Sequence, residues 1–117
     1  MKLILRSSDF LVAGCINQMQ YVALMLMVSQ ATGYVPGKFT WDVQNIQIYD
    51  RHIKQAVELL NREPVNCIED DYTEPHLSLN PGISDFYDFT MDDIHIKNYP
   101  RELIKTKNPQ LKFDKGI

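Results

Sequence analysis

The chain has 117 residues, of which 44% are hydrophobic and 23% are charged, and its formal net charge at pH 7 is −3. This size and composition fit one ordinary globular domain with a modest core. The slight negative charge argues against a nucleic-acid-binding surface, which would require a basic face. Because the two cysteines lie far apart and we expect no signal peptide, the sequence excludes a disulfide framework and favours the cytoplasm.

The N-terminal third of the chain predicts a short strand and a long helix. The strand is predicted over residues 2–5, which contain the apolar run Leu3-Ile4-Leu5. Residues 14–32 are rich in Leu, Met and Ala, and Gly33 follows where a helix cap is expected. The most apolar stretch of this helix, residues 21–28, is shorter than the ~20 apolar residues of a membrane-spanning helix. We therefore expect no membrane segment, but a helix that is buried on most sides of a soluble protein.

Alternating apolar and polar side chains over residues 39–48 predict a second strand, and the phase of the alternation changes between Val43 and Ile46. Such a change indicates a β-bulge in a long, bent strand. Asp50 is the expected N-cap of a second helix over residues 51–61. Further strands are expected at residues 77–79 and 94–97. We therefore predict an α+β fold, in which a long buried helix and a shorter helix pack on a mixed, bulged β-sheet.

A polar motif follows the first strand. Arg6-Ser7-Ser8-Asp9 places a guanidinium group beside a hydroxyl group, and both can donate hydrogen bonds to phosphate oxygens. Asn17 lies eleven positions after the arginine, and its amide offers a donor and an acceptor that can match the polar edge of a pyrimidine ring. Gln47 and Tyr49 occupy alternate positions of a predicted strand, so their side chains point the same way. The motif therefore predicts a phosphate grip, together with an amide that can match a pyrimidine ring.

These residues, in this order and spacing, resemble the thymidylate synthase family. The family carries an Arg-Ser-x-Asp strand, an asparagine eleven residues past the arginine and a tyrosine thirty-two residues past the asparagine. Arg6, Asn17 and Tyr49 keep both intervals. The further matches are Tyr21, Trp41, His52, Arg62-Glu63-Pro64 and Phe86-Tyr87-Asp88-Phe89.

The resemblance covers residues 3 to about 99 and corresponds to only the C-terminal part of the family. We expect residues 1–117 to be a single domain like that part, with a divergent tail at about 100–117. The family segment that bears the catalytic cysteine and its glutamate partner matches nothing in the sequence. Neither Cys15 nor Cys67 has the family's Pro-Cys-His context, and we expect Cys15 to be a small, buried apolar residue. We therefore expect no catalytic residue, and no activity from this chain alone.

The resemblance implies a pyrimidine nucleotide site that binds dUMP. The residues that it assigns to this site are Arg6, Ser7, Asp9, Asn17, Gln47 and Tyr49. In the family the tyrosine forms a hydrogen bond with the 3′-hydroxyl group of the sugar. The family methylates dUMP to dTMP with 5,10-methylenetetrahydrofolate, and it forms dimers in which one face of the sheet meets its twin. We expect this chain to be a homodimer as well, because the strand edges and apolar surface left by the missing segment must be covered.

Departures from the family pattern leave other functions open. Gln47 replaces a histidine, Asn45 an aspartate, Ala13 a glycine and Val43-Gln44 a glycine-rich segment. Together with the missing catalytic segment, they favour a non-catalytic interaction or structural module as the alternative to nucleotide binding. A fragment of a longer active enzyme, or of a nucleotide hydroxymethylase, is a further alternative. Hydroxymethylases that act on cytidylate carry an acid in place of Asn17, so the sequence favours uracil.

Each site residue also has a purely structural interpretation. Arg6 could pair with Asp9 on the surface. Asn17 could cap the helix locally or be a buried polar group, and Tyr49 could be plain core. We expect no metal site, because the three histidines lack the spacing of metal ligands; they are His52, His76 and His95.

Overall fold

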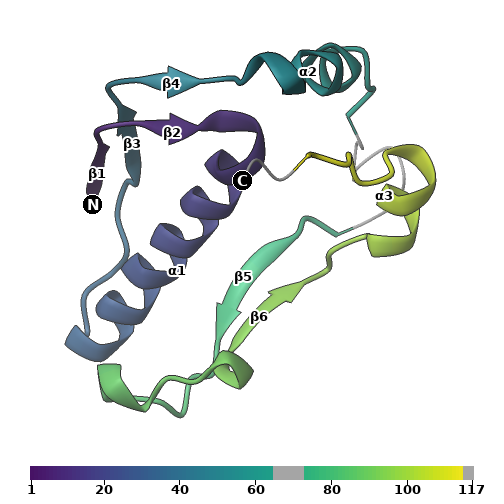
Figure 1. Ribbon diagram of the computed structural model, residues 1–117. Helices are drawn as coiled ribbons and strands as arrows, with labels where there is room; N and C mark the ends of the chain where they lie inside the picture. Colours follow the sequence, from purple (N-terminus) through teal and green to yellow (C-terminus); the bar gives the residue numbers. More distant parts are fainter. Residues whose placement is uncertain (65–72, 115–117) are drawn as a thin grey trace. The chain divides into compact units, whose positions relative to one another are not determined.

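The structure is a computed structural model that describes residues 1–64 and 73–114, and its elements are labelled in Figure 1. The chain divides into two compact units, each made of two segments. The first unit consists of Met1–Gln47 and Leu77–His95, and the second consists of Ile48–His76 and Ile96–Ile117. Helices and short strands occur together, which confirms the α+β class predicted from the sequence.

A bent parallel ribbon forms the N-terminal part of the first unit (Figure 1). In this ribbon β1 (Lys2–Leu5) pairs with β3 (Thr40–Val43), and β2 (Ser8–Asp9) pairs with β4 (Ile46–Gln47). The pairing stops after Leu5, which lies opposite Val43, and resumes at Ser8, which lies opposite Ile46. Two residues are skipped on each strand, so the register is the same before and after this gap. The predicted β-bulge is therefore wrong. Both strands bend at the same place, whereas a bulge would insert an extra residue into one of them.

The long predicted helix is α1 (Cys15–Thr32), and a π-helical turn at Phe10–Gly14 leads directly into it. Leu, Met, Ala and Gln have high helix propensity and fill most of α1. Gly33 ends the helix in the left-handed conformation, with a φ angle of 73°, and its N–H donates to Gln30 O at 3.3 Å. The predicted glycine cap is confirmed, because glycine adopts this conformation without the steric cost of a Cβ.

Two sets of contacts hold α1 within the first unit. At its start, Phe10 stacks on Trp41 of β3 with 6.2 Å between the ring centroids. A Cβ atom on Gly14 would lie 3.3 Å from Phe10 Cδ2 and 3.5 Å from Trp41, so the glycine lets the helix approach the ribbon closely. Near the end of α1, the Gln30 side-chain amide donates to Asn80 O at 2.8 Å and to Ile83 O at 2.6 Å.

The helix is nevertheless not buried as the sequence predicts. No residue of α1 is buried, and Ile16, Met19 and Val28 remain 57%, 51% and 45% exposed. In the part of the chain that the structure describes, no apolar side chain is fully buried. With its preceding turn, the stretch Phe10–Thr32 has 23 residues and is long and apolar enough to cross a membrane, a test that core helices of soluble proteins also pass. The sequence prediction counts only residues 21–28 as the apolar stretch. The polar residues on both sides of that stretch carry no charge, so the segment that passes the test is longer.

The remaining two-stranded sheet joins β5 (His76–Leu79) and β6 (Ile94–Lys97), which lie where the sequence predicts strands. Their connection contains two 3-10 turns, Phe86–Asp88 and Met91–Asp93. The Asp93 carboxylate accepts hydrogen bonds from the Thr90 hydroxyl at 2.7 Å, from Asn80 Nδ2 at 2.8 Å and from the Thr90 N–H at 2.9 Å. These hydrogen bonds hold the pKa of Asp93 below its ordinary value of 3.8, and the one from the Thr90 hydroxyl has the largest effect.

The second unit begins with a 3-10 turn at Asp50–His52 that leads into α2 (Ile53–Leu60), and it contains α3 (Arg101–Lys107). The predicted N-cap role of Asp50 is wrong. The turn begins directly after Tyr49, so Asp50 is already its first residue, and neither the turn nor α2 has a side-chain cap.

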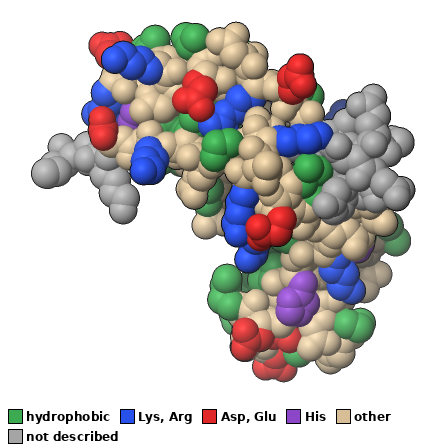
Figure 2. Space-filling view, turned by 90° about the vertical axis from the view of Figure 1, so that its right-hand side faces the viewer, with side chains coloured by type: hydrophobic (Ala, Val, Ile, Leu, Met, Phe, Trp, Pro, Cys, Tyr) green, Lys and Arg blue, Asp and Glu red, His purple; other side chains and the backbone are tan. Residues whose placement is uncertain are grey.

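The segment after α3 lies along the start of α2. Lys112 O accepts a hydrogen bond from Gln55 Nε2 at 3.0 Å, and Asp114 O lies 3.2 Å from His52 Nε2. The Phe113 ring meets the His52 ring edge to face, and His52 is only 1% exposed. On the face shown in Figure 2, Lys and Arg side chains are interspersed with Asp and Glu.

Candidate functional site

The predicted phosphate-binding residues lie at the bend of the parallel ribbon. Arg6 and Ser7 are exposed and connect β1 to β2. On either side of them, Gln44 N donates to Leu5 O and Ser8 N donates to Asn45 O, each at 3.0 Å. The ribbon therefore holds the backbone at both ends of the bend, and the two side chains leave it toward solvent.

The Arg6 guanidinium forms no ion pair with any residue that the structure describes. Its suggested partner, the Asp9 carboxylate, has a different role: Asp9 Oδ1 accepts a hydrogen bond from Val12 N at 3.3 Å and caps the turn before α1. The structural alternative of an Arg6–Asp9 pair is therefore not realised. Arg6 keeps all its donors for a ligand, while Asp9 holds the start of the helix against the ribbon.

Asn17 lies in the first turn of α1 and is half-buried. The N-cap position of α1 is Gly14, and no side chain caps the helix there. Asn17 is therefore not the local cap that its structural interpretation requires. Its amide has no hydrogen-bond partner among the described residues, so both its donor and its acceptor remain open.

Gln47 belongs to the same corner of the first unit. It ends β4 and lies directly opposite Asp9 in the parallel register. Residues in register on neighbouring parallel strands have side chains on the same face. The ribbon thus brings Gln47 next to Asp9, at the end of the segment Arg6–Asp9 that forms the bend, which is called the corner below. The turn after Asp9 leads into the helix that carries Asn17.

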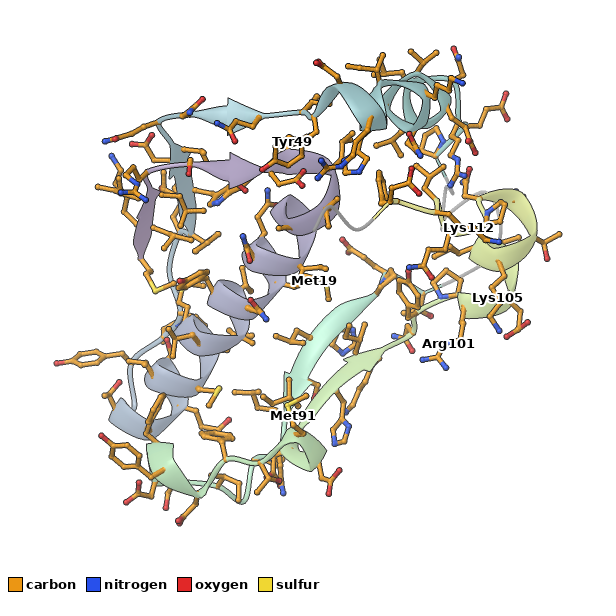
Figure 3. The ribbon with its side chains drawn as sticks, in the orientation of Figure 1. Met19, Tyr49, Met91, Arg101, Lys105 and Lys112 are labelled. Atoms are coloured by element: carbon orange, nitrogen blue, oxygen red, sulfur yellow. The ribbon has the colours of Figure 1, made fainter. Side chains whose placement is uncertain are left out.

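Tyr49 belongs to the second unit, just before α2 (Figure 3). Its ring is 40% exposed, and the Arg51 guanidinium lies 4.6 Å from the ring centroid. The buried His52 ring meets it edge to face at 6.0 Å. Tyr49 is therefore not plain core, since two neighbours orient its ring while its surface remains accessible.

One residue of the motif has a structural role that sequence reasoning missed. Ser8 is 6% exposed, and its hydroxyl has no hydrogen-bond partner in the described part of the chain. The alternation of β1 gives no signal for this burial: Leu3 and Leu5 are on its inner face, so the same period of two would place Ser8 on the outer face. Ser8 nevertheless packs against the inner side of the ribbon, whereas Arg6 and Ser7 are exposed.

The expectation that Cys15 is buried is wrong. Cys15 is exposed, because the first turn of α1 is not covered by the elements around it. Cys67 lies outside the described residues. Among the residues that the structure does describe, no group of three His, Cys, Asp or Glu side chains could hold a metal ion.

Comparison with known proteins shows to which family the chain belongs. The family model of thymidylate synthase matches residues 1–109. The chain belongs to the thymidylate synthase family. It is 47% identical over 113 residues to a thymidylate synthase from Streptococcus mutans and 44% identical over 113 residues to one from Streptococcus pneumoniae. These alignments cover 96% of the chain but 37% of each relative.

The fold of the chain is also similar to a solved thymidylate synthase. It matches thermostable thymidylate synthase A from Bacillus subtilis with a TM-score of 0.73 and 34% sequence identity. This match covers 84% of the chain and 33% of the Bacillus protein. The thymidylate synthase-like fold predicted from the sequence is confirmed. The chain spans about a third of the length of the thymidylate synthases that it resembles.

Proposed function

We propose that this chain binds dUMP and supplies the nucleotide-binding part of a thymidylate synthase. The observation that carries the proposal is Arg6, which is exposed and has no ion-pair partner among the described residues, at a bend whose backbone is fixed on both sides. A guanidinium with free donors can bind a phosphate group bidentately, and the adjacent Ser7 hydroxyl adds a further donor. The corner is thus suited to a phosphate monoester.

The other residues of the site then receive distinct roles. The open amide of Asn17 would pair with the polar edge of uracil, and Gln47 would contact the sugar. Asp9 acts as a positioning residue, because its carboxylate holds the turn that connects the ribbon to α1. Tyr49 is assigned to the sugar 3′-hydroxyl from its spacing to Asn17 in the family pattern.

We infer that the chain does not by itself transfer a methyl group to dUMP. The family reaction uses 5,10-methylenetetrahydrofolate and an activated thiol, and neither cysteine has the family's sequence context. Two positions ahead of α1 also leave little room for the folate: Ala13 adds a methyl group where the family has glycine, and Gly14 is packed against Phe10 and Trp41. We therefore assign no folate contact to this chain.

Its assembly and location are proposed from the family as well. We expect a cytoplasmic homodimer, in which the sheet of one chain faces the sheet of the other. Exposed apolar side chains on the ribbon, among them Ile4 and Ile46, support an association that covers a face of the sheet. Light scattering at micromolar concentration should give twice the monomer mass, and a clean monomer would contradict this part of the proposal.

The proposal is tested by isothermal titration of the whole chain with dUMP, with dCMP as the matched control ligand. The two nucleotides carry the same phosphate and sugar and differ in the polar edge of the base. Binding of dUMP in the micromolar to millimolar range, at least tenfold tighter than dCMP, would support the assignment. Absence of binding to either nucleotide would reject it and favour the non-catalytic interaction module.

A further inference from the structure

A buried histidine of the second unit has no role in the site described above. His52 ends the turn between Tyr49 and α2, and at 1% it is the least exposed of the buried polar side chains that the structure describes. Its Nε2 atom lies 3.2 Å from Asp114 O. Because a carbonyl oxygen can only accept a hydrogen bond, Nε2 carries the proton. The other ring nitrogen, Nδ1, is also buried and has no partner in the described part of the chain.

An imidazole is a costly choice for filling this position. A hydrocarbon side chain of similar size would leave no buried nitrogen without a partner. What the imidazole adds is a directional hydrogen bond, which fixes the plane of the ring relative to the backbone at Asp114. The Phe113 ring also meets the His52 ring edge to face, with 5.1 Å between the centroids. The hydrogen bond and the aromatic contact together define the orientation of the His52 ring.

The segment that provides both contacts is itself anchored along α2. Asn108 Nδ2 donates to Glu63 O at 2.9 Å beyond the end of the helix, and Gln55 Nε2 donates to Lys112 O at 3.0 Å near its start. Residues 108–114 are called the strap below. Because the strap is held at both ends of α2, its position does not depend on His52 alone.

The oriented His52 ring also contacts Tyr49, which lies just before α2 (Figure 3). The two ring centroids are 6.0 Å apart and the rings are nearly perpendicular, with an angle of 82° between their planes. The second neighbour of the Tyr49 ring is Arg51, whose guanidinium lies 4.6 Å from the centroid and whose side chain is exposed. The Tyr49 hydroxyl has no hydrogen bond to a described residue. The buried His52 ring is therefore the more rigid of the two contacts that orient Tyr49.

We propose that His52 is a positioning residue for the sugar of the nucleotide: its ring, fixed by Asp114 O, holds the Tyr49 phenol in the orientation that binds the 3′-hydroxyl group. The inference rests on the proposed function, which assigns Tyr49 to that hydroxyl. Since His52 is buried, it acts through Tyr49 and not on the ligand. A histidine with a merely structural role would affect all nucleotides alike, whereas a positioning residue affects those that carry a 3′-hydroxyl group.

The test is isothermal titration of the His52→Ala chain with two ligands, dUMP and 2′,3′-dideoxyuridine 5′-monophosphate. The second ligand lacks only the 3′-hydroxyl group. The expected loss of dUMP affinity is about fivefold, which is the contribution of one neutral hydrogen bond. The affinity for the dideoxy ligand should not change. Equal losses with both ligands, or no loss with either, would overturn the proposal.

A double variant tests whether His52 acts through Tyr49. Tyr49→Phe removes the hydroxyl group and keeps the ring, so His52→Ala should cause no further loss of dUMP affinity in that background. Additive losses would overturn the proposal. His76→Ala is the matched control, because His76 is an exposed histidine of the same unit. It should leave both affinities unchanged, and a loss confined to dUMP as large as that of His52→Ala would contradict the assignment to His52.

Two further measurements keep the inference testable by itself. If His52→Ala does not fold, His52→Phe replaces it; phenylalanine fills the space but cannot donate to Asp114 O, so a loss confined to dUMP is again expected, and unchanged dUMP affinity overturns the proposal. If the unsubstituted chain binds no nucleotide, the proposed function fails, and NMR of the free chain decides the positioning role. The Hα–Hβ couplings of Tyr49 should then show one side-chain rotamer in the unsubstituted chain and averaging in the His52 variant, whereas identical couplings would overturn the inference.

Discussion

Replacement of Arg6 is the most informative single perturbation of the site. Arg6→Ala removes a guanidinium that is exposed and unpaired in the described structure, so the variant loses no internal ion pair and should fold normally. A hydrogen bond to a charged group contributes about 1.5–3 kcal/mol, and about 1.4 kcal/mol corresponds to a tenfold change in affinity. Because Arg6 is exposed, solvent screening places the expected loss at the lower end. We therefore expect dUMP affinity to fall at least tenfold.

Isothermal titration of three variants measures this effect. Arg6→Lys keeps the positive charge but not the bidentate geometry, so its affinity should lie between those of the unsubstituted chain and Arg6→Ala. Lys38→Ala is the control, since it makes the same change in net charge at an exposed loop position of the same unit. Unchanged affinity in Arg6→Ala, or an equal loss in Lys38→Ala, would refute the assignment of Arg6 to the phosphate.

Three further results are expected. Asn17→Asp should shift the preference from dUMP toward dCMP, because a carboxylic acid presents a different pattern to the base; competition titration with both nucleotides measures this, and an unchanged preference would contradict the role of Asn17. The Asp93 carboxylate has a lowered pKa in the folded state, so it stabilises the fold above its unfolded pKa of about 3.8, and this contribution is lost as the pH falls through the lower folded value. Acid titration followed by circular dichroism should therefore show a weaker pH dependence below about pH 5 in Asp93→Asn, and identical acid transitions would contradict the hydrogen-bonding account. Gly33→Ala places a Cβ at a φ angle of 73° and should lower stability by about 1 kcal/mol, or roughly 4 °C in Tm for a domain of this size; thermal melting measures it, and an unchanged Tm would show that the cap is unimportant.

Local signals in the sequence predicted where elements begin and end better than how they are capped or bent. Gly33 ends α1 as expected, because a helix commonly ends at a residue in the left-handed conformation and glycine adopts that conformation most easily. The phase change between Val43 and Ile46 correctly predicted a break in the strand pairing. The sequence of one strand does not show whether its partner bends at the same place, so the phase change alone predicts a bulge. Asp50 failed as a cap because the turn begins one residue earlier than the apolar spacing of α2 suggested.

Burial was the feature that the sequence could not supply. The composition of α1 indicates a helix that must be covered, and the sequence does not say by what. Cys15 and Met19 are exposed because the elements that this chain places around α1 do not reach them. Ser8 is buried although the alternation of β1 would place it on the outer face, because the chain bends between β1 and β2 and the phase of burial changes there. The motif spacing of Arg6, Asn17 and Tyr49 carried the family, which the comparisons confirm.

The measurement that tests the central claim most directly is a residue-resolved NMR titration of the 15N-labelled chain with dUMP. The account predicts saturable shift changes at the backbone or side-chain N–H groups of Arg6, Ser7, Asn17 and Gln47, with much smaller changes when dCMP is added. Shift changes that are confined to other parts of the chain, or none at millimolar dUMP, would contradict it.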